Sequence, residues 1–226
     1  MDFKDIYFDT GEIRLHGLEG PASGPALVLL HGATSNCGDW MGLMPELTQR
    51  WHVFSFDLRG HGLSGWPSGP QGYHISHNLA DVLALLRGVV RERAVLLGHS
   101  YGAVISALAG RDAADWLRGI ALEDPPMMLR RDNDESKAFL DFFGWLYQVR
   151  KPAKTLEDVL AGLSAQNPQA PIESLRPWAQ SVFWLDPDYL LAITSGDKRE
   201  TVRGVDFEAH IRGIACPVLL MQADPA

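Results

Sequence analysis

One serine stands between two glycines in the segment AVLLGHSYGAVISALAG, which covers residues 94–110. Residues 98–102 match the pattern Gly-x-Ser-x-Gly, with an apolar run directly before them and small residues at helical spacing after them. A sharp turn from a strand into a helix presents a serine hydroxyl at the positive end of the helix, and the glycines leave room for the neighbouring backbone. This context predicts that Ser100 is a nucleophile. The alternative interpretation is a serine that caps the N-terminus of the helix.

A second candidate feature follows the first buried apolar run, where LVLLHGATS places a loop at residues 31–34. A serine that attacks an acyl carbon needs two backbone N–H groups aimed at the negative charge that develops on the carbonyl oxygen. The natural donors of this oxyanion hole are the N–H groups of Ala33, in the loop, and Tyr101, directly after Ser100. The residues that we expect to support the loop and the turn are His31, Gly32, Gly98, His99 and Gly102.

The chain around these residues alternates between apolar runs and amphipathic segments. Short apolar runs without alternation are typical of strands that are buried on both faces of a parallel sheet. Such runs lie at residues 26–30, 52–56, 94–97, 119–122 and 217–221, and amphipathic segments lie at residues 40–50, 77–90 and 103–111. Residues 3–8 and 12–18 flank a turn and predict an antiparallel hairpin. The order of elements predicts an α/β fold with a mostly parallel sheet opened by this hairpin.

A predominantly helical stretch interrupts this order after Asp124. Helical patterns lie at residues 134–149, 155–163 and 172–184, and Asp186-Pro187 opens a further short helix. We therefore expect a core of residues 1–124 and 212–226, with residues 125–211 inserted as a helical cap. The aromatic side chains of this insertion are Phe139, Phe142, Phe143, Trp145, Tyr147, Trp178, Phe183 and Trp184. We expect most of them to pack against the core and the others to line an apolar pocket over Ser100.

Composition excludes several classes of protein. The chain has 226 residues, of which 46% are hydrophobic and 21% charged, and its formal net charge is -8. An acidic balance argues against binding to nucleic acid, which needs a basic face. Two cysteines, Cys37 and Cys216, form no disulfide framework, and no apolar run approaches the ~20 residues that span a bilayer. We expect a cytoplasmic protein that acts on a small molecule, without a metal and away from membranes.

Four segments carry a resemblance to a known family: the His-Gly loop at 31–32, FDLRGHGLS at 56–64, the turn at 98–102 and ACPVLLMQAD at 215–224. In this order they resemble the α/β-hydrolase superfamily in its cap-bearing form. The resemblance implies eight strands, a nucleophile after the fifth, a helical cap after the sixth, and catalysis without a cofactor. A serine as the nucleophile argues against haloalkane dehalogenases and epoxide hydrolases, which place an aspartate there.

The resemblance also implies a triad in the order serine, acid, histidine. Asp124, in IALEDPP, and Asp224, in LLMQADPA, are both candidates for the acid, and Asp124 is slightly favoured. No histidine follows His210, so the eighth strand and the histidine loop of the family are expected to be missing from this chain. Loss of the histidine lowers kcat on the order of a million-fold in subtilisin. We therefore expect the chain to be nearly inactive, with the seventh strand as an uncovered sheet edge.

The expected reaction is cleavage of a small, mostly apolar carboxylic ester, or of a related acyl or carbon–carbon bond, through an acyl-enzyme on Ser100. Two other functions stay open. The first is a non-catalytic protein that has the same fold and binds a ligand, and the absence of a histidine after His210 suggests it. The second is a cofactor-free haloperoxidase or perhydrolase, which uses the same kind of serine site.

Overall fold

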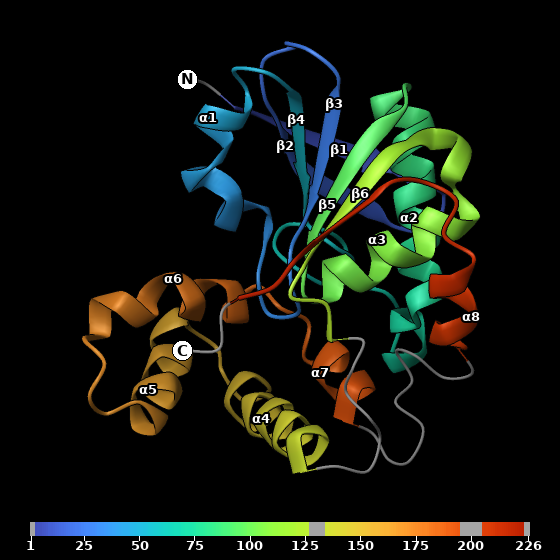
Figure 1. Cartoon of the computed structure of the whole chain (residues 1–226). Helices are drawn as coiled ribbons and strands as arrows, with labels where there is room; N and C mark the ends of the chain where they lie inside the picture. Colours follow the sequence, from blue (N-terminus) through green and yellow to red (C-terminus); the bar gives the residue numbers. More distant parts are fainter. Residues whose placement is uncertain (1–2, 127–133, 195–204, 224–226) are drawn as a thin grey trace.

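The structure is a computed structural model that describes residues 3–126, 134–194 and 205–223. Its centre is a single sheet with the strand order β1-β2-β4-β3-β5-β6-β7 (Figure 1). Strands β1 (Lys4–Asp9) and β2 (Arg14–Glu19) form the predicted antiparallel hairpin, and β2 pairs antiparallel with β4. All further strand pairs are parallel, so the predicted fold class is confirmed.

The five predicted apolar runs all form strands of the parallel part of the sheet. These strands are β3 (Ala26–Leu30), β4 (His52–Phe56), β5 (Ala94–His99), β6 (Leu117–Glu123) and β7 (Val218–Met221). Every residue of β3, at the centre of the sheet, is buried, as its lack of alternation predicted. The described residues form seven strands, one fewer than the resemblance implied. Strand β7 lies at the edge, where Leu219 and Leu220 are more than half exposed.

Helices cover both faces of the sheet (Figure 1). Helices α2 (Ile75–Leu85), α3 (Tyr101–Asp112) and α8 (Phe207–Arg212) lie on one face, while the turn η1 (Cys37–Gly42) and helix α1 (Met44–Leu47) lie on the other. The amphipathic segment at residues 40–50, which we expected to be helical, does not form one continuous helix. Pro45 lies in the first turn of α1, where a helix tolerates a residue without an N–H. Inside a longer helix the same proline would remove a hydrogen bond and clash with the preceding turn, so the segment divides into two short pieces.

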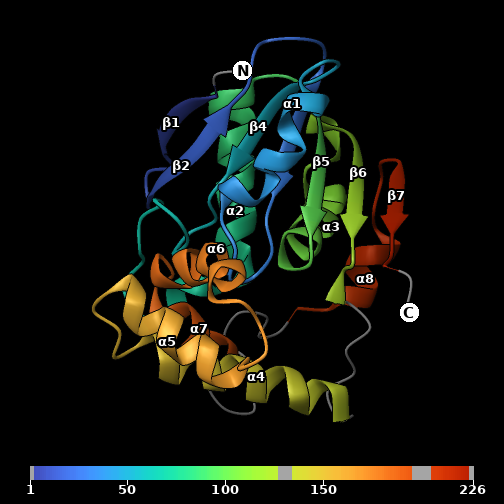
Figure 2. The same cartoon turned by 90° about the vertical axis from the view of Figure 1, so that its left-hand side faces the viewer.

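Four helices lie beyond the carboxyl ends of the parallel strands, and we call them the cap (Figure 2). They are α4 (Asp134–Arg150), α5 (Leu156–Gln166), α6 (Ile172–Phe183) and α7 (Pro187–Thr194). Helix α5 begins with a capping box, because Thr155 accepts from the N–H of Asp158 and the Asp158 side chain accepts from the N–H of Thr155. Helix α8 lies beside α3 instead, so the proposed insertion over residues 125–211 includes one helix that packs on the core.

A buried polar contact fastens the cap to the core. The hydroxyl of Tyr73 donates to Oδ2 of Asp186 (2.5 Å), and the N–H of Asp186 donates to the carbonyl of Gly60 (2.8 Å). Burial raises the pKa of the Asp186 carboxyl, although the hydrogen bond from Tyr73 opposes the rise. In the described part of the chain, no helix combines the length and the apolar character needed to cross a membrane.

Candidate active site

Ser100 lies at the seam between β5 and α3, where the sequence pattern predicts a sharp turn. Its backbone has φ +51° and ψ −112°, a conformation that side-chain-bearing residues rarely adopt. The N–H of Ser100 donates to the carbonyl of Glu123 on β6 (2.8 Å), so the neighbouring strand holds the strained turn in place. Strain of this kind persists only where the surroundings enforce it, and it is concentrated at functional sites.

Close backbone approach explains both glycines of the pattern. A Cβ on Gly98 would lie 2.3 Å from the carbonyl carbon of Gly102, and a Cβ on Gly102 would lie 2.2 Å from the carbonyl oxygen of Leu30. Neither neighbour is a flexible side chain that could move aside, so a larger residue at either position would force the backbone apart. The turn thus requires glycine at both positions.

The loop after β3 passes directly beside the serine. A Cβ on Gly32 would lie 3.3 Å from Cβ of Ser100, and Thr34 adopts a positive φ of +130°. Within the described ranges, the N–H of Ala33 donates to no protein acceptor. The N–H of Tyr101 belongs to the first residue of α3 and therefore has no intrahelical acceptor. In the described residues, two amides without a protein acceptor thus lie on the segments that flank Ser100.

His31 ties the loop to the segment after β4. Its Nδ1 donates to the carbonyl of Gly32 (2.7 Å), and its Nε2 accepts from the N–H of Leu58 (3.0 Å). These two bonds define a neutral ring with the proton on Nδ1, and burial lowers the pKa of His31. Both ring nitrogens are thus occupied by backbone groups, and His31 is in no position to accept a proton from Ser100.

Asp124 follows β6 as Ser100 follows β5. In the parallel register His99 pairs with Glu123, so the next residues, Ser100 and Asp124, leave the sheet side by side. Asp124 also has a positive φ, +44°, and its Oδ1 accepts from the N–H of Ala223 (2.7 Å). Asp224, the other candidate for the acid, lies outside the described residues.

The eight histidines all lie in the described ranges, and none of them contacts the hydroxyl of Ser100. The partners of their ring nitrogens are Asp5 and Asp57 (His16), Gly32 and Leu58 (His31), Glu19 (His52), Arg59 (His61), Ser76 (His74), Glu12 (His77) and Asp206 (His210). His99, next to the serine, lines a cavity. In the described residues, no histidine is therefore hydrogen-bonded to Ser100.

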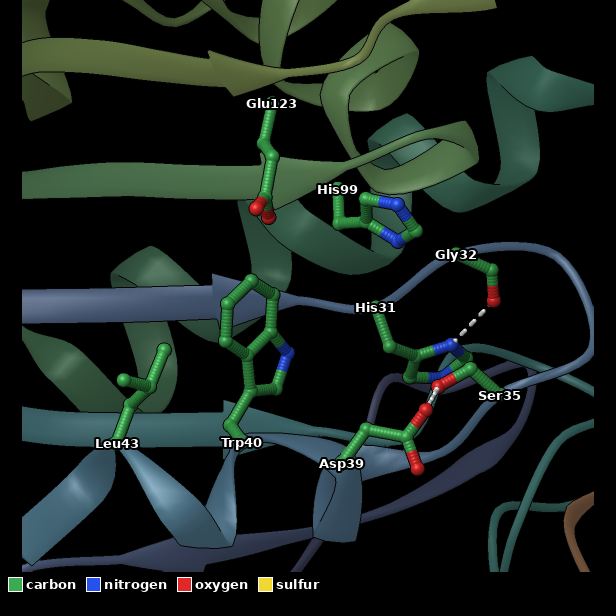
Figure 3. Close-up of a pocket in the computed structure, with 8 residues that line it drawn as sticks. All are labelled: His31, Gly32, Ser35, Asp39, Trp40, Leu43, His99 and Glu123. Atoms are coloured by element: carbon green, nitrogen blue, oxygen red, sulfur yellow. Dashed lines mark hydrogen bonds between the residues drawn. The ribbon is translucent and has the colours of Figure 1, made fainter. Parts of the chain in front are cut away.

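That cavity has a volume of about 220 Å³ and lies on the η1 face of the sheet (Figure 3). It is lined by His31, Gly32, Ser35, Asp39, Trp40, Leu43, His99 and Glu123. Figure 3 shows Glu123 and His99, from the ends of β6 and β5, on the side that faces Trp40 of η1. Ser100 is not among the described residues that line it, although Gly32, which lies beside Ser100, and His99, the residue before it, both do.

A second cluster of chemically capable side chains was not found from the sequence. Ligand atoms of His16, Cys37 and Asp57 lie within 4.8 Å of one another, a spacing that a metal ion could use. However, the Asp57 carboxylate already accepts from His16 Nδ1 (2.6 Å) and from the N–H groups of Cys37 (2.6 Å) and Leu63 (2.9 Å). Burial and the nearby Asp57 raise the pKa of the Cys37 thiol, which keeps it protonated. We interpret the cluster as structural.

Five aromatic residues of the cap form one connected group of rings: Phe139, Phe142, Phe143, Trp145 and Trp178. Phe143 is buried, whereas Phe142 is 40% exposed and stacks on Trp178 with ring centroids 6.2 Å apart. Trp145 contacts both of these rings. Packing within the cap thus accounts for most of these rings, and Phe142 keeps an exposed surface.

Comparisons with known proteins identify the family of the chain. The sequence model of the Alpha/beta hydrolase family matches residues 27–226. The chain is 30% identical over 220 residues to 2-(acetamidomethylene)succinate hydrolase of Mesorhizobium japonicum, an alignment that covers 96% of this chain and 76% of that protein. It is 34% identical over 138 residues to epoxide hydrolase A of Mycobacterium tuberculosis, which covers 60% of this chain but only 43% of that relative.

A solved structure shows the same likeness in three dimensions. The crystal structure of E-2-(acetamidomethylene)succinate hydrolase matches with a TM-score of 0.77 and 26% identity, over 97% of this chain and 80% of that one. The family match includes β3, the loop after it, the turn at Ser100 and every later strand. The chain therefore belongs to the alpha/beta hydrolase family.

Proposed function

We propose that this chain carries the nucleophile and the oxyanion hole of a serine hydrolase that cleaves a small, mostly apolar carboxylic ester. Ser100 Oγ attacks the carbonyl carbon, and the N–H groups of Ala33 and Tyr101 stabilise the negative charge on the carbonyl oxygen. The alcohol leaves with a proton, and water then hydrolyses the acyl group from Ser100. The observation that supports this most is the strained turn that holds Ser100 beside two unpaired amides.

Asp124 is the acid that we favour in this scheme, with Asp224 as the other candidate. A carboxylate orients the imidazole that takes the serine proton and stabilises the imidazolium that forms. Because no described histidine contacts Ser100, we expect the 226-residue chain alone to turn over slowly. A hydrolase of this kind acts on a small molecule, and a cytoplasmic location is part of the proposal.

An amide is the second candidate for the bond that is cleaved. The relative from Mesorhizobium japonicum is named for a substrate with an acetamido group, which contains an acyl C–N bond. Ester and amide cleavage use the same nucleophile and oxyanion hole, and they differ in the leaving group that must be protonated. Parallel assays with matched acetyl esters and acetamides distinguish them. A perhydrolase, which shares the same site, is distinguished by an assay with peroxide and acetate.

Chemical rescue tests the proposal directly. We expect hydrolysis of p-nitrophenyl acetate by the 226-residue chain to be slow and to rise with added imidazole, because a soluble base then takes the proton of Ser100. The Ser100→Ala variant measures the reaction of imidazole with the ester alone, and Ser106→Ala, in the same helix, is the matched control. Acetylation of Ser100 is located by mass spectrometry of the intact chain and its peptides. The same rescue in wild type and Ser100→Ala, with no acetyl group on Ser100, would contradict the proposal.

A non-catalytic ligand-binding protein is the second candidate function. It is favoured by the contacts of the eight histidines, none of which is with Ser100. This function predicts that a small ester or acid binds equally well to the wild-type chain and to Ser100→Ala, and that imidazole produces no Ser100-dependent turnover. Calorimetric titration of both proteins measures the binding.

A further inference from the structure

Two cap helices contact the two segments that carry the proposed oxyanion hole. Helix α6 contacts the loop of Ala33 through Ser181, and helix α7 contacts the start of α3 through Tyr189. We propose that Ser181 and Tyr189 are positioning residues, through which the cap sets the direction of the Ala33 and Tyr101 N–H groups. This inference rests on the proposed function for its catalytic meaning, while its structural content can be tested without any activity.

The contact on the loop side is a hydrogen bond across 145 residues of sequence. Asn36 Nδ2 donates to Ser181 Oγ (2.7 Å), and Asn36 Oδ1 accepts from the N–H of Gly38 (2.7 Å), the second residue of η1. Ser181 Oγ in turn donates to the carbonyl of Pro177 (3.2 Å), and the side chain is only 3% exposed. Both polar groups of the Asn36 side chain therefore have a partner. The amide oxygen caps the N-terminus of η1, and the amide nitrogen binds the cap.

Backbone strain lies between this contact and the candidate amide. Thr34, one residue after Ala33 and two before Asn36, has φ +130°, a conformation that the local sequence does not favour. Such a residue keeps its conformation only when both sides are held. His31 holds the side before it by two backbone hydrogen bonds, and Asn36 holds the side after it. Release of Asn36 by the cap is expected to relax Thr34 and turn the Ala33 N–H.

The contact on the other side is made by aromatic rings. Tyr189, 1% exposed, lies edge-on to Tyr101 with ring centroids 5.8 Å apart and planes at 64°. The far end of the Tyr101 ring is also held, because its hydroxyl accepts from Asn78 Nδ2 (3.2 Å). A ring held at both ends restrains the side chain of the first residue of α3, and with it the backbone that carries the second proposed oxyanion-hole donor.

We expect the contact of Ser181 with Asn36 and the contact of Tyr189 with Tyr101 to be coupled, because the helices that carry Ser181 and Tyr189 are consecutive. Only residues 184–186 separate these helices, and Asp186 is anchored to the core by Tyr73. A displacement of the cap, such as closure on a substrate, would therefore reach both amides. The expected kinetic signature is a change in kcat at nearly constant KM, because the amides bind the transition state more strongly than the substrate.

The test measures the two amides themselves. In two-dimensional ¹H–¹⁵N spectra, Ser181→Ala is expected to shift the Ala33 resonance and speed its hydrogen exchange, while Tyr189→Leu does the same for Tyr101. Asn36→Asp removes the donor to Ser181 but keeps the acceptor for Gly38, so it should reproduce the effect of Ser181→Ala. The double variant should add nothing further, because both changes break one bond.

Two controls separate positioning from a general loosening of the cap. Ser164→Ala removes a buried hydroxyl of α5 that has no partner in the described residues, and it should leave both amides unchanged. Tyr189→Phe keeps the ring and should restore the Tyr101 resonance. If Ser181→Ala and Asn36→Asp shift Ala33 no more than Ser164→Ala does, the inference is wrong. The Ser181 and Asn36 variants decide the question even if Tyr189→Leu fails to fold.

Imidazole-rescued acetylation of Ser100 then connects the amides to the chemistry. Ser181→Ala is expected to lower the rescued rate constant roughly ten- to a hundredfold at unchanged KM, since small displacements of a positioned group have effects of this size. Shifted amides with no Ser100-dependent reaction in the wild type would support the positioning contact and contradict the proposed function. A Ser100-dependent reaction in the wild type, together with amides that do not shift in the variants, would support the proposed function and contradict the positioning contact.

Discussion

The backbone N–H of Ser100 donates to the carbonyl of Glu123, 2.8 Å away, so the turn that presents the serine is fastened to the end of the neighbouring strand. The residue after Glu123 is Asp124, whose positive φ turns the chain away from the sheet. Two adjacent parallel strands thus end in one strained residue each, and these two residues are the candidate nucleophile and the favoured acid. Their proximity follows from strand register and needs no long-range loop.

Asp124→Asn is therefore expected to slow the reaction of Ser100 while the fold is kept. Asparagine tolerates a positive φ and its amide oxygen can still accept from Ala223, so only the charge is lost. Loss of this carboxylate lowers kcat by about 10⁴ in the chymotrypsin-type triad, and we expect at least about a tenfold loss of imidazole-rescued acetylation here. The measurement is the rescued rate with p-nitrophenyl acetate, with thermal unfolding as the check on folding.

Asp224→Asn is the comparison for this prediction. We expect it to change the rescued rate less than Asp124→Asn does. A large loss in Asp224→Asn together with a normal rate in Asp124→Asn would assign the acid to Asp224 instead.

Gly102→Ala is expected to prevent normal folding of the turn. The added Cβ would lie 2.2 Å from the carbonyl oxygen of Leu30 on the central strand, and backbone cannot move aside without breaking the sheet. We expect a loss of at least about 3 kcal/mol in the free energy of unfolding, measured by urea denaturation. Gly144→Ala in α4 is the matched control, because nothing lies within 4 Å of the added atom. That change should stabilise the protein by about 0.5–1 kcal/mol. Equal effects of the two changes would exclude a steric role for Gly102.

The sequence predicted those features of the fold that depend on residues close together in the chain. The five apolar runs all became strands, although β7, at the edge of the sheet, is largely exposed instead of buried on both faces. The glycines around Ser100 were predictable because a strained turn leaves no room for Cβ. Thr155 marked the start of α5, since a cap is a contact between residues three apart. The helix predicted over residues 40–50 failed where Pro45 competes with amphipathic spacing.

Contacts between distant residues could not be predicted in the same way. The hydrogen bond from Asn36 to Ser181 joins residues that no spacing relates, and the packing of α8 on α3 depends on how the chain returns to the sheet. The buried contact between His16 and Asp57 likewise appears only once β2 and β4 pair. Such contacts depend on tertiary structure, which a single sequence does not encode as a pattern.

Tyr73→Phe is expected to loosen the cap from the core. It leaves the buried carboxylate of Asp186 without its hydroxyl donor, which costs about 1–3 kcal/mol. Because the contact joins η2 (Pro70–Tyr73) to the start of α7, we expect faster proteolysis in the cap before any change in the sheet. Limited proteolysis followed by mass spectrometry locates the cleavages. Tyr147→Phe, which changes an exposed contact with Lys151, is the control. Cleavage at the same sites and rates in both variants would argue against the contact as an anchor.

His61 is expected to make the protein less stable in acid. Burial, together with the neighbouring His31, lowers the pKa of His61 to about 3, whereas an unfolded histidine titrates near 6.5. Between these values the unfolded state binds the additional proton, so the free energy of unfolding falls as the pH falls, by about 1.4 kcal/mol per pH unit from this group. The stabilisation is complete above pH 6.5. Urea denaturation at pH 7, 6 and 5 measures the slope.

His61→Asn isolates this contribution, since the amide N–H₂ can still donate to the carbonyl of Arg59 as Nδ1 does. We expect a shallower slope between pH 6.5 and 5 in this variant. The acid sensitivity that comes from Asp57 is retained, but it belongs to lower pH, at and below the ordinary carboxyl pKa of about 3.9, because the hydrogen bond with His16 lowers the pKa of Asp57 against the effect of burial. The same substitution at exposed His210 controls for the change of residue. The His61 ring is buried beside His31 and Tyr189, so we expect it to stay neutral in the folded protein. An identical slope in the wild type and His61→Asn would contradict this expectation, because it would mean that the folded protein binds the proton on His61 as readily as the unfolded chain does.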